Sequence, residues 1–573
     1  MFQVAGGAVL RRMLVSGAAM TALLGAAVMT SGTTGAPSTS SCTAAWPMYQ
    51  HDAGHSANGC STVSQLDAPG LHLAWFASTG GAAVTAEPIE SGGLLYVGDY
   101  NGLFHAVSAA TGVGAWTFNI ESGANTCGYA DQHQPSYGEI TSSAAVGTVP
   151  SRVGPVVYFG GGGTLYALDA TTGTCLWHQD VDPVHVKSPT EIESSPVLDV
   201  AANPAELIVG SDSNGATGTT PGLIAFNAGT GALLWKYLPA TNQTQHTLSS
   251  RQDDNTDSGC GDVWSSPALD TSALSGDGMA VFGVGDCNRP SQFSYPEALI
   301  AVDATTGNES WAFHEPPNGY DYDPSTNPPS VYDDDFGASP IITAPLPTSA
   351  GTEPLVIEGG KSGFVYGLDE SGHLVWQVHA AQSGNYNVGP GGIGGFIGSP
   401  ALGMANGRPT VFLTSAILSP LAGGGIQGDK SAPTGTFPDT GLVCAPGFPP
   451  APNTTGCDPL RATALHAVDA ATGTVVWQAP LTTPTYAPAS YTNGVVFAPS
   501  TTSFANEAFD ADTGTQLWVS PIAAAASSGT SIAGQSIFFG GGTGYGMAGS
   551  EDVPPQNFGI WSFTTALAIP STP

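Results

Sequence analysis

Acidic and amide side chains are the residues of this chain whose types and spacing come nearest to a chemical site. In the segment RQDDNTDSGCGD, Asp253, Asn255 and Asp257 stand at alternate positions before Gly259. Short calcium-binding loops direct oxygen ligands inward with this spacing. Because no Glu follows to complete such a loop, the segment is more typical of a solvated acidic loop.

Other reactive residue types form no recognisable site. The sequence contains no Cys-x-x-Cys-His, so a covalently attached c-type haem is excluded, and no spacing of Cys and His indicates zinc. The glycine runs 160–163 and 540–542 are not followed by Lys-Ser or Lys-Thr, so they do not predict a phosphate-binding loop. The paired serines recur with a period, and that period explains them.

A repeated unit must position any site in this chain. ALDATTGTCLW, which ends at Trp177, recurs as AFNAGTGALLW, AVDATTGNESW, AVDAATGTVVW and AFDADTGTQLW, and two looser copies end at Trp116 and Trp376. Each copy predicts a hairpin, since a β-rich run meets an Asp/Thr/Gly turn and a second run closes on Trp. An apolar strand after a step such as Ser195-Pro196 raises the count to four short strands per unit, which is typical of a propeller blade.

The two ends of the chain indicate how the propeller closes. Trp75, in LHLAWFA, has no hairpin before it, whereas residues 532–563 contain strands but no full copy of the repeat. Pairing these two pieces would cover the strand edges of an open ring. The sequence therefore predicts an all-β, eight-bladed β-propeller of four-stranded antiparallel blades, with the last blade closed by an N-terminal strand. The recurrent tryptophans are interpreted as packing between blades.

The N-terminal region predicts export. Arg11 and Arg12 precede an apolar run at 13–29, and a Ser/Thr/Gly/Pro stretch follows. The paired arginines also fit a twin-arginine signal, and an uncleaved anchor is an alternative although the run is slightly short for a membrane span. We therefore expect residues 1–41 to be an export signal and flexible linker. Residues 42–573 are expected to form one propeller domain with a loop insertion at about 415–460, secreted and without membrane contact beyond the signal segment.

Charge and cysteine content narrow the partners and the compartment. Acidic residues outnumber basic ones 45 to 11, giving a net charge of −34, which argues against a nucleic-acid partner. Eight cysteines, an even number, are consistent with an oxidising compartment, although free structural thiols remain an alternative. Three pairs are close enough in sequence to staple loops and leave Cys127 and Cys175 over: Cys42 with Cys60, Cys260 with Cys287, and Cys444 with Cys457.

The repeated unit A-x-D-A-x-T-G-x-x-x-W resembles the pyrroloquinoline-quinone (PQQ) repeat. From Trp46 onward the chain resembles the eight-bladed propellers that carry this repeat. They include quinoprotein dehydrogenases, among them the polyvinyl-alcohol dehydrogenase type, and non-catalytic relatives that assist outer-membrane protein assembly. The opening WPMYQHD resembles the start of the polyvinyl-alcohol dehydrogenase type, and we interpret Trp46 to Gly59 as a packed N-terminal strap. Fold alone does not settle function.

The resemblance implies a cofactor site. Trp264 in GDVWSSP matches the tryptophan that faces the quinone, and Asp286 in VFGVGDCN, with Asn288 close behind, matches the ligand of a calcium ion that polarises the quinone. Asp321 in GYDYDP matches the general base for the alcohol proton, and Asp323 is its neighbour. The alternatives are a tryptophan that only packs at a blade end and surface carboxylates in a Pro-rich loop.

The chain also departs from the dehydrogenase pattern. It has no pair of adjacent cysteines, since Cys127 is followed by Gly128. The stretch that should supply a Glu calcium ligand, 210–220, offers Asp212 and Asn214 instead. Asp212 could substitute as a metal ligand, although its shorter side chain needs the loop to approach more closely.

Two functions from different classes follow. The first is a secreted quinoprotein dehydrogenase that uses PQQ and calcium to oxidise an alcohol or sugar, either small or polymeric. The second is a non-catalytic binding or scaffold propeller for a protein or glycan partner. Convergence of Trp264, Asp286 and Asp321 on one mouth of the propeller would favour the first function, and their dispersal the second.

Overall fold

A computed structural model provides the architecture. It describes residues 45–213, 219–248, 261–270, 278–285, 297–314, 332–333, 335–349, 351–381, 384–385, 395–416, 464–481, 485–500, 506–521, 526–542 and 557–566. The chain divides into two compact units, Met1–Cys42 and Thr43–Pro573, and the described residues all belong to the second.

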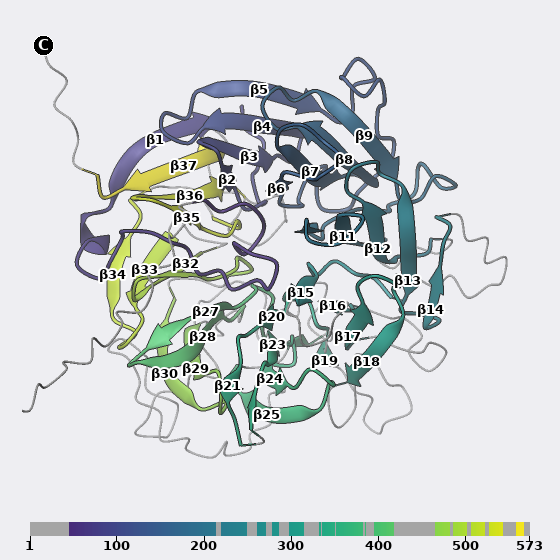
Figure 1. Cartoon of the computed structure of the whole chain (residues 1–573). Helices are drawn as coiled ribbons and strands as arrows, with labels where there is room; N and C mark the ends of the chain where they lie inside the picture. The colour runs from purple at the N-terminus through teal and green to yellow at the C-terminus, as the bar shows by residue number, and fades with distance from the viewer. Residues whose placement is uncertain are drawn as a thin grey trace, which may run out of the picture. The chain divides into compact units, whose positions relative to one another are not determined.

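Eight antiparallel sheets follow one another around a common centre (Figure 1). Blades one to four are β2 (Ile89–Ser91), β3 (Leu94–Gly98), β4 (Leu103–Ser108), β5 (Gly114–Asn119); β6 (Ala145–Gly147), β7 (Val156–Gly161), β8 (Thr164–Asp169), β9 (Cys175–Asp180); β10 (Val197–Asp199), β11 (Glu206–Ser211), β12 (Gly222–Asn227), β13 (Leu233–Leu238), with β14 (Gln243–Gln245) as a fifth strand; and β15 (Ala268–Asp270), β16 (Met279–Gly283), β17 (Ala298–Asp303), β18 (Glu309–His314).

Blades five to eight complete the ring. They are β20 (Ile341–Ile342), β23 (Val356–Gly359), β24 (Phe364–Leu368), β25 (Leu374–His379); β27 (Ala401–Ala405), β28 (Arg408–Thr414), β29 (Ala464–Asp469), β30 (Val475–Pro480); β31 (Ser490–Thr492), β32 (Val495–Pro499), β33 (Asn506–Asp510), β34 (Gln516–Val519); and β35 (Ser531–Ala533), β36 (Ser536–Gly541), β37 (Gly559–Thr564), β1 (His72–Ser78). Two short ladders, β19 (Tyr332–Asp333) with β26 (Gly384–Asn385) and β21 (Leu346–Pro347) with β22 (Thr352–Glu353), and one 3-10 helix, η1 (Ala68–Gly70), lie outside the blades. In the described part of the chain, no helix is long and apolar enough to cross a membrane.

Local sequence explains the hairpin at the edge of each blade. The carboxylate of Asp169 accepts hydrogen bonds from the backbone N–H of Thr171 and Thr172 and from the Thr172 hydroxyl, at 2.8–3.0 Å. Gly173 then adopts a φ of 69°, a conformation that other residues reach only with strain. The Asp-x-Thr-Gly wording of the repeat is therefore a requirement of the turn.

The recurrent tryptophans join neighbouring blades. Trp177 lies against Gly231 of the next hairpin, where a Cβ atom would come within 2.8 Å of the indole. Its indole N–H also donates to the carbonyl of Ala228, at 3.0 Å. The same donation into the following blade, at 2.7–3.1 Å, is made by Trp75, Trp116, Trp177, Trp235, Trp311, Trp376, Trp477 and Trp518. This confirms their interpretation as packing between blades.

The predicted closure is also confirmed. In the eighth sheet, the N-terminal strand β1 pairs antiparallel with the last strand β37, and Trp75 lies opposite Ser562. In Figure 1 the purple strand β1 lies beside the yellow strand β37. Because β1 occupies the fourth position of this blade, its Trp75 takes the same place as the tryptophan of every other blade.

The segment 46–62 forms the predicted strap. Its backbone hydrogen-bonds to the first or second strand region of seven blades, beginning with Trp46 and Glu90 in the first blade, at 2.9–3.0 Å. The partners in the other blades are Val146, Leu269, Ile342, Leu402, Tyr491 and Gly534. The strap therefore adds hydrogen bonds along the innermost strands on one side of the ring.

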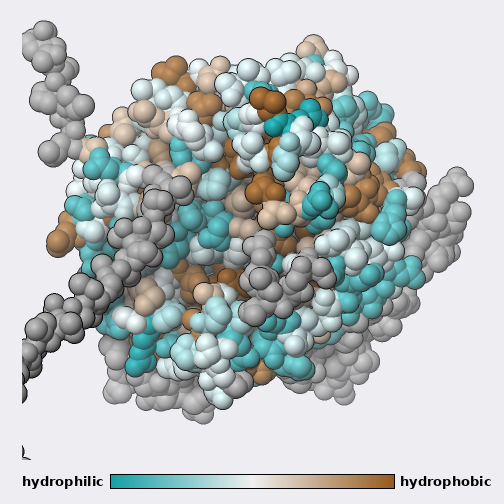
Figure 2. All heavy atoms as spheres, in the orientation of Figure 1, coloured by the Kyte–Doolittle hydropathy of each residue, from teal (hydrophilic) through white to brown (hydrophobic). Residues whose placement is uncertain are grey.

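Hydrophobic side chains are dispersed over the surface. On the face shown in Figure 2, hydrophobic residues form separate small patches among hydrophilic ones. Exposed large hydrophobic side chains such as Leu66, Val113 and Val153 come from different blades and connections. The described surface thus offers scattered apolar side chains, which are ordinary for a globular protein.

Candidate functional site

The segments that lead into the innermost strands carry the candidate site. Aligned on their Ser-Pro step, blades three, four and five read EIESSP, DVWSSP and DFGASP, from residues 191, 262 and 335. Glu191, Asp262 and Asp335 therefore hold equivalent positions, as do Glu193, Trp264 and Gly337. Each acid also accepts a hydrogen bond, through its main-chain carbonyl, from a residue one or two positions beyond the second strand of its own blade: Asp212, Gly285 and Lys361.

Trp264 is seated between two blades. A Cβ atom on Gly285 would lie 2.3 Å from the indole nitrogen, and one on Gly337 of the fifth blade would lie 1.8 Å from the far edge of the ring. Only glycine leaves room for the indole at both places. The ring, which is half-buried, is thus held by the backbone of two adjacent blades.

Lys361 places a positive charge over this indole. Its Nζ lies 5.3 Å from the ring centroid, within the range of a cation–π interaction. The same Nζ contacts Oδ2 of Asp335 at 2.5 Å, and the Asp335 side chain is almost fully buried. The buried carboxylate of Asp335 therefore orients Lys361 over the face of the indole, and the ammonium group is fixed at the site.

Two glutamates of the third blade add carboxyl groups with perturbed protonation. Burial, reinforced by the charge of Glu193, raises the pKa of Glu191 to about 9, although backbone N–H groups of Ser136 and Tyr137 hydrogen-bond to it. Burial and the nearby Asp262 raise the pKa of Glu193 to about 7, while Lys361 acts in the opposite direction. At neutral pH Glu191 is thus protonated and Glu193 is poised to titrate.

One oxygen of Glu191 is available to a ligand. Oε2 accepts the two backbone hydrogen bonds, whereas Oε1 is buried without a hydrogen-bond partner among the described residues. A buried carboxyl oxygen without a partner costs free energy, so a bound cation or a donor from a ligand would relieve that cost.

The serines of the Ser-Pro steps lie between this site and the strap. The backbone N–H of Ser195 donates to Oγ of Ser266, that of Ser266 to Ser339, and that of Ser339 to Ser399, each at 2.8 Å. In blade four the order along the chain is Trp264, Ser266 and then Leu269, which donates its N–H to the strap. The strap and the candidate site therefore approach the innermost strands from opposite ends.

The structure describes only two of the residues that the sequence predicts for the cofactor site. Trp264 lies in the site, and Asp212 lies in a segment, 211–213, that hydrogen-bonds to residues 262–263 of the next blade. Asn214, Asp286, Asn288, Asp321 and Asp323 lie outside the described residues, as does the 253–259 segment. The sequence alone did not identify four residues of the site: Glu191, Glu193, Asp335 and Lys361. The internal alignment on Ser-Pro was the available signal, because it places Glu193 in register with Trp264.

The described cysteines form no disulfide between adjacent residues. Cys127 is bonded to Cys175, 48 residues away and in another segment of the chain. These are the two cysteines that pairing by proximity left over, and Cys60 is disulfide-bonded as well. None of these cysteines is paired with its sequence neighbour.

Comparison with known proteins finds relatives that carry the PQQ-type propeller. Residues 46–388 match the PQQ family described as the glucose/ethanol/alcohol dehydrogenase β-propeller domain, and residues 449–550 match a PQQ family described as outer membrane protein assembly factor BamB. The dehydrogenase subunit of alcohol dehydrogenase (quinone) from Komagataeibacter europaeus is 25% identical over 343 residues, which are 54% of this chain and 41% of that protein. Quinoprotein glucose dehydrogenase from Escherichia coli K12 is 25% identical over 370 residues, 58% of this chain and 43% of that protein. The chain thus matches less than half the length of either relative.

Solved structures support the same fold. Quinohemoprotein alcohol dehydrogenase from Comamonas testosteroni aligns with a TM-score of 0.59 and 17% identity, over 92% of this chain and 82% of that one. A europium-containing methanol dehydrogenase aligns with a TM-score of 0.61 and 16% identity, over 91% and 98%. Since the first family match covers more than half of the sequence, the chain belongs to the PQQ family of glucose, ethanol and alcohol dehydrogenase β-propeller domains.

Proposed function

We propose that this protein is an exported quinoprotein dehydrogenase that binds PQQ together with calcium at the mouth formed by blades three to five and oxidises an alcohol or sugar. The observation that carries the proposal is the seated indole of Trp264 with the ammonium of Lys361 above it. A flat aromatic ring beside a fixed cation suits a planar, anionic cofactor, and PQQ is a planar quinone with three carboxylates.

The residues present fit this cofactor in shape and in part of their charge. Gly285 and Gly337 leave room for the half-buried indole of Trp264, and Lys361 is the cation that would face a carboxylate or a quinone oxygen. Glu193, Asp262 and the oxygen of Glu191 that has no partner offer hard ligands for calcium. The bound cation would also neutralise these acids, which would otherwise repel the carboxylates of PQQ.

Each residue then has a separate task. PQQ, when bound, supplies a quinone that accepts hydride from the alcohol carbon. Trp264 orients the ring, and Lys361 with Asp335 holds a positive charge at one edge of the site. We propose Asp286, Asn288 and Asp212, with Asn214, as further calcium ligands. Asp321, with Asp323 beside it, is proposed as the base that takes the hydroxyl proton of the substrate.

Cofactor uptake by the purified protein tests the proposal. We expect saturable binding of PQQ in the presence of calcium, followed by reduction of an artificial dye when an alcohol or sugar from a panel is added. Trp264→Ala should abolish uptake at micromolar PQQ, whereas Asp321→Asn should keep uptake and lose dye reduction. Glu121→Gln, which changes an exposed acid of the first blade's outer connection, is the matched control and should leave both unchanged.

The alternative function predicts a different result. A scaffold propeller that has lost the cofactor would show no uptake of PQQ at micromolar concentration with calcium present. Retained uptake in Trp264→Ala would also contradict the site as proposed. The acidic residues around Lys361 would favour the scaffold function only if the protein bound no calcium ion next to them.

A further inference from the structure

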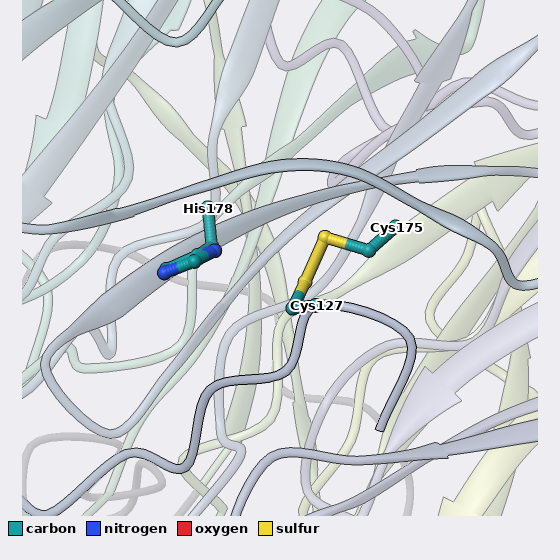
Figure 3. A group of neighbouring side chains, drawn as sticks. All are labelled: Cys127, Cys175 and His178. Carbon is teal, nitrogen blue, oxygen red and sulfur yellow. A yellow bond between two sulfur atoms is a disulfide. The ribbon is translucent and has the colours of Figure 1, made fainter. Parts of the chain in front are cut away.

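A second group of ligand-type side chains lies in blade two, apart from the residues of the proposed cofactor site. Cys127, Cys175 and His178 each offer one ligand atom, and these atoms lie within 4.8 Å of one another. Figure 3 shows the imidazole of His178 beside the disulfide that joins the two cysteines. All three residues are half-buried, so solvent and small solutes can reach them.

A β-bulge explains why Cys175 and His178 share one face of β9. In a regular strand, residues three apart point to opposite faces. The pairing of β8 with β9 is shifted between Ala167 and Leu168, because Trp177 pairs with Ala167 and Cys175 pairs with Leu168. Leu176 is the extra residue, and the bulge turns Cys175 onto the face of His178.

Hydrogen bonds position Cys127 in addition to the disulfide. The Asn125 side-chain amide donates to the carbonyls of Asn119 and Tyr129, at 2.8 and 2.7 Å, and so holds the loop that carries Cys127. The Thr126 hydroxyl donates to the carbonyl of Gly173 and accepts the backbone N–H of Cys175. These bonds would keep the two sulfur atoms close after reduction.

Ring stacking orients His178 and leaves its nitrogen atoms able to bind a ligand. Its ring stacks on Tyr129 with a centroid distance of 4.4 Å. Within the described residues, neither of its nitrogens makes a hydrogen bond. Burial lowers the pKa of the imidazole, so the neutral form that binds metals is present at neutral pH. A histidine held by stacking with free nitrogens is a suitable metal ligand.

We propose that, when the Cys127–Cys175 disulfide is reduced, the two thiolates and His178 bind a thiophilic d10 cation such as Zn²⁺, and that reoxidation by a small-molecule disulfide, which takes up the two electrons, releases it. A dithiol reductant passes two electrons and two protons to the disulfide, which yields two thiols and the disulfide of the reductant. Zn²⁺ then binds and displaces the two thiol protons. Two thiolates and a neutral imidazole suit this cation, and the fourth position stays open to water.

The three ligand atoms start close to one another. Ligand atoms around a tetrahedral zinc ion lie roughly 3.3–3.8 Å apart, given bond lengths of about 2.0–2.3 Å. The two sulfur atoms, which are bonded to each other in the disulfide, must separate to this distance after reduction, and the His178 nitrogen, which lies within 4.8 Å of them, must approach. Because the site does not use Trp264 or Lys361, it stands or falls separately from the proposed cofactor site.

Metal titration of the oxidised and reduced protein tests the proposal. The protein is reduced with a phosphine, desalted without oxygen, and titrated with Co²⁺ as a spectroscopic probe and with Zn²⁺ against a chromogenic chelator. We expect one additional equivalent of tight binding after reduction, with thiolate-to-cobalt charge-transfer absorption, and its loss when an oxidant restores the disulfide.

Variants separate this site from the other cysteines. The double variant Cys127→Ser/Cys175→Ser should lose the additional equivalent, and His178→Ala should weaken binding at least tenfold. His178→Cys should restore tight binding, which a merely structural role for the histidine would not do. His373→Ala, at an exposed histidine of blade five, is the control and should bind as the unchanged protein does.

Three results would overturn the proposal. The first is equal uptake of metal before and after reduction, and the second is full uptake by the double serine variant. The third is unfolding of the reduced protein, followed by circular dichroism, without recovery on adding Zn²⁺.

Discussion

The indole N–H of Trp518 donates to the backbone carbonyl of Leu71 at 3.1 Å, a bond that joins residues 447 positions apart. Leu71 directly precedes β1, so this bond connects the seventh blade to the N-terminal part of the eighth. It repeats the contact that each of the other seven recurrent tryptophans makes with its following blade. The ring is therefore closed by the same interaction that joins its other blades.

Truncating Trp518 should destabilise the whole ring. Trp518→Ala removes a nearly buried indole and is expected to lower the free energy of unfolding by about 3–5 kcal/mol. Trp518→Phe keeps most of the packing and loses the hydrogen bond, for a loss of about 1–2 kcal/mol. Urea denaturation measures both. The exposed Leu66, changed to Ala, is the control; an equal loss there would contradict a special role for the recurrent tryptophans.

The charges around Trp264 should act on PQQ affinity in opposite directions. Lys361→Gln removes the cation above the indole and should weaken PQQ binding about tenfold, equivalent to about 1.4 kcal/mol. In calcium-free buffer, where Glu193 coordinates no ion, Glu193→Gln removes a carboxylate and should strengthen PQQ binding at pH 8. At pH 6 the gain should vanish, because the pKa of Glu193 is raised to about 7 and the native side chain is then protonated. Calorimetric titration at the two pH values measures this, and a gain of equal size at both would refute it.

Glu191 should make stability fall as the pH rises. Its pKa is raised from 4.5 to about 9, so between these values the folded state holds a proton that the unfolded state releases. Stability is then lost with increasing pH, by at most about 1.4 kcal/mol per pH unit for this one proton. Glu191→Gln should remove that part of the slope. Chemical denaturation from pH 5 to pH 9 tests it, and an unchanged slope would mean that Glu191 ionises normally.

The Cys127–Cys175 disulfide should stabilise the oxidised protein. It closes a loop with a sequence separation of 48, so replacing both cysteines by serine is expected to lower the unfolding free energy by about 2–4 kcal/mol. Thermal and urea unfolding of the oxidised variant against the oxidised parent provide the measurement. In the reduced state the two proteins should differ little, and a persistent difference would point to a packing defect caused by serine.

The propeller could be predicted from the sequence because the same short segment, which specifies the hairpin of one blade, recurs along the chain. The hairpin at Asp169 to Gly173 is specified within a few residues, and Trp177 recurs at a fixed place after it. The unpaired strand around Trp75 identified the closing partner, since strands need a partner at an exposed edge.

A site residue could be predicted only where the sequence of its own blade identifies it. Trp264 was found because its own segment carries the signature, whereas Lys361 comes from another blade, almost a hundred residues later. Their contact depends on how the fourth and fifth blades are rotated against each other, which no local pattern encodes. The pairing of Cys127 with Cys175 depends in the same way on where a loop packs against a neighbouring hairpin.

The strap imposes an order on folding. Residues 46–62 are synthesised before all their hydrogen-bond partners, which extend as far as Gly534. Contacts between such distant parts of a chain form slowly, because the entropy of closing the loop must be overcome first. A chain emerging from its N-terminus would carry an unsatisfied strap until the last blade appeared. Its early blades would expose open strand edges during that interval.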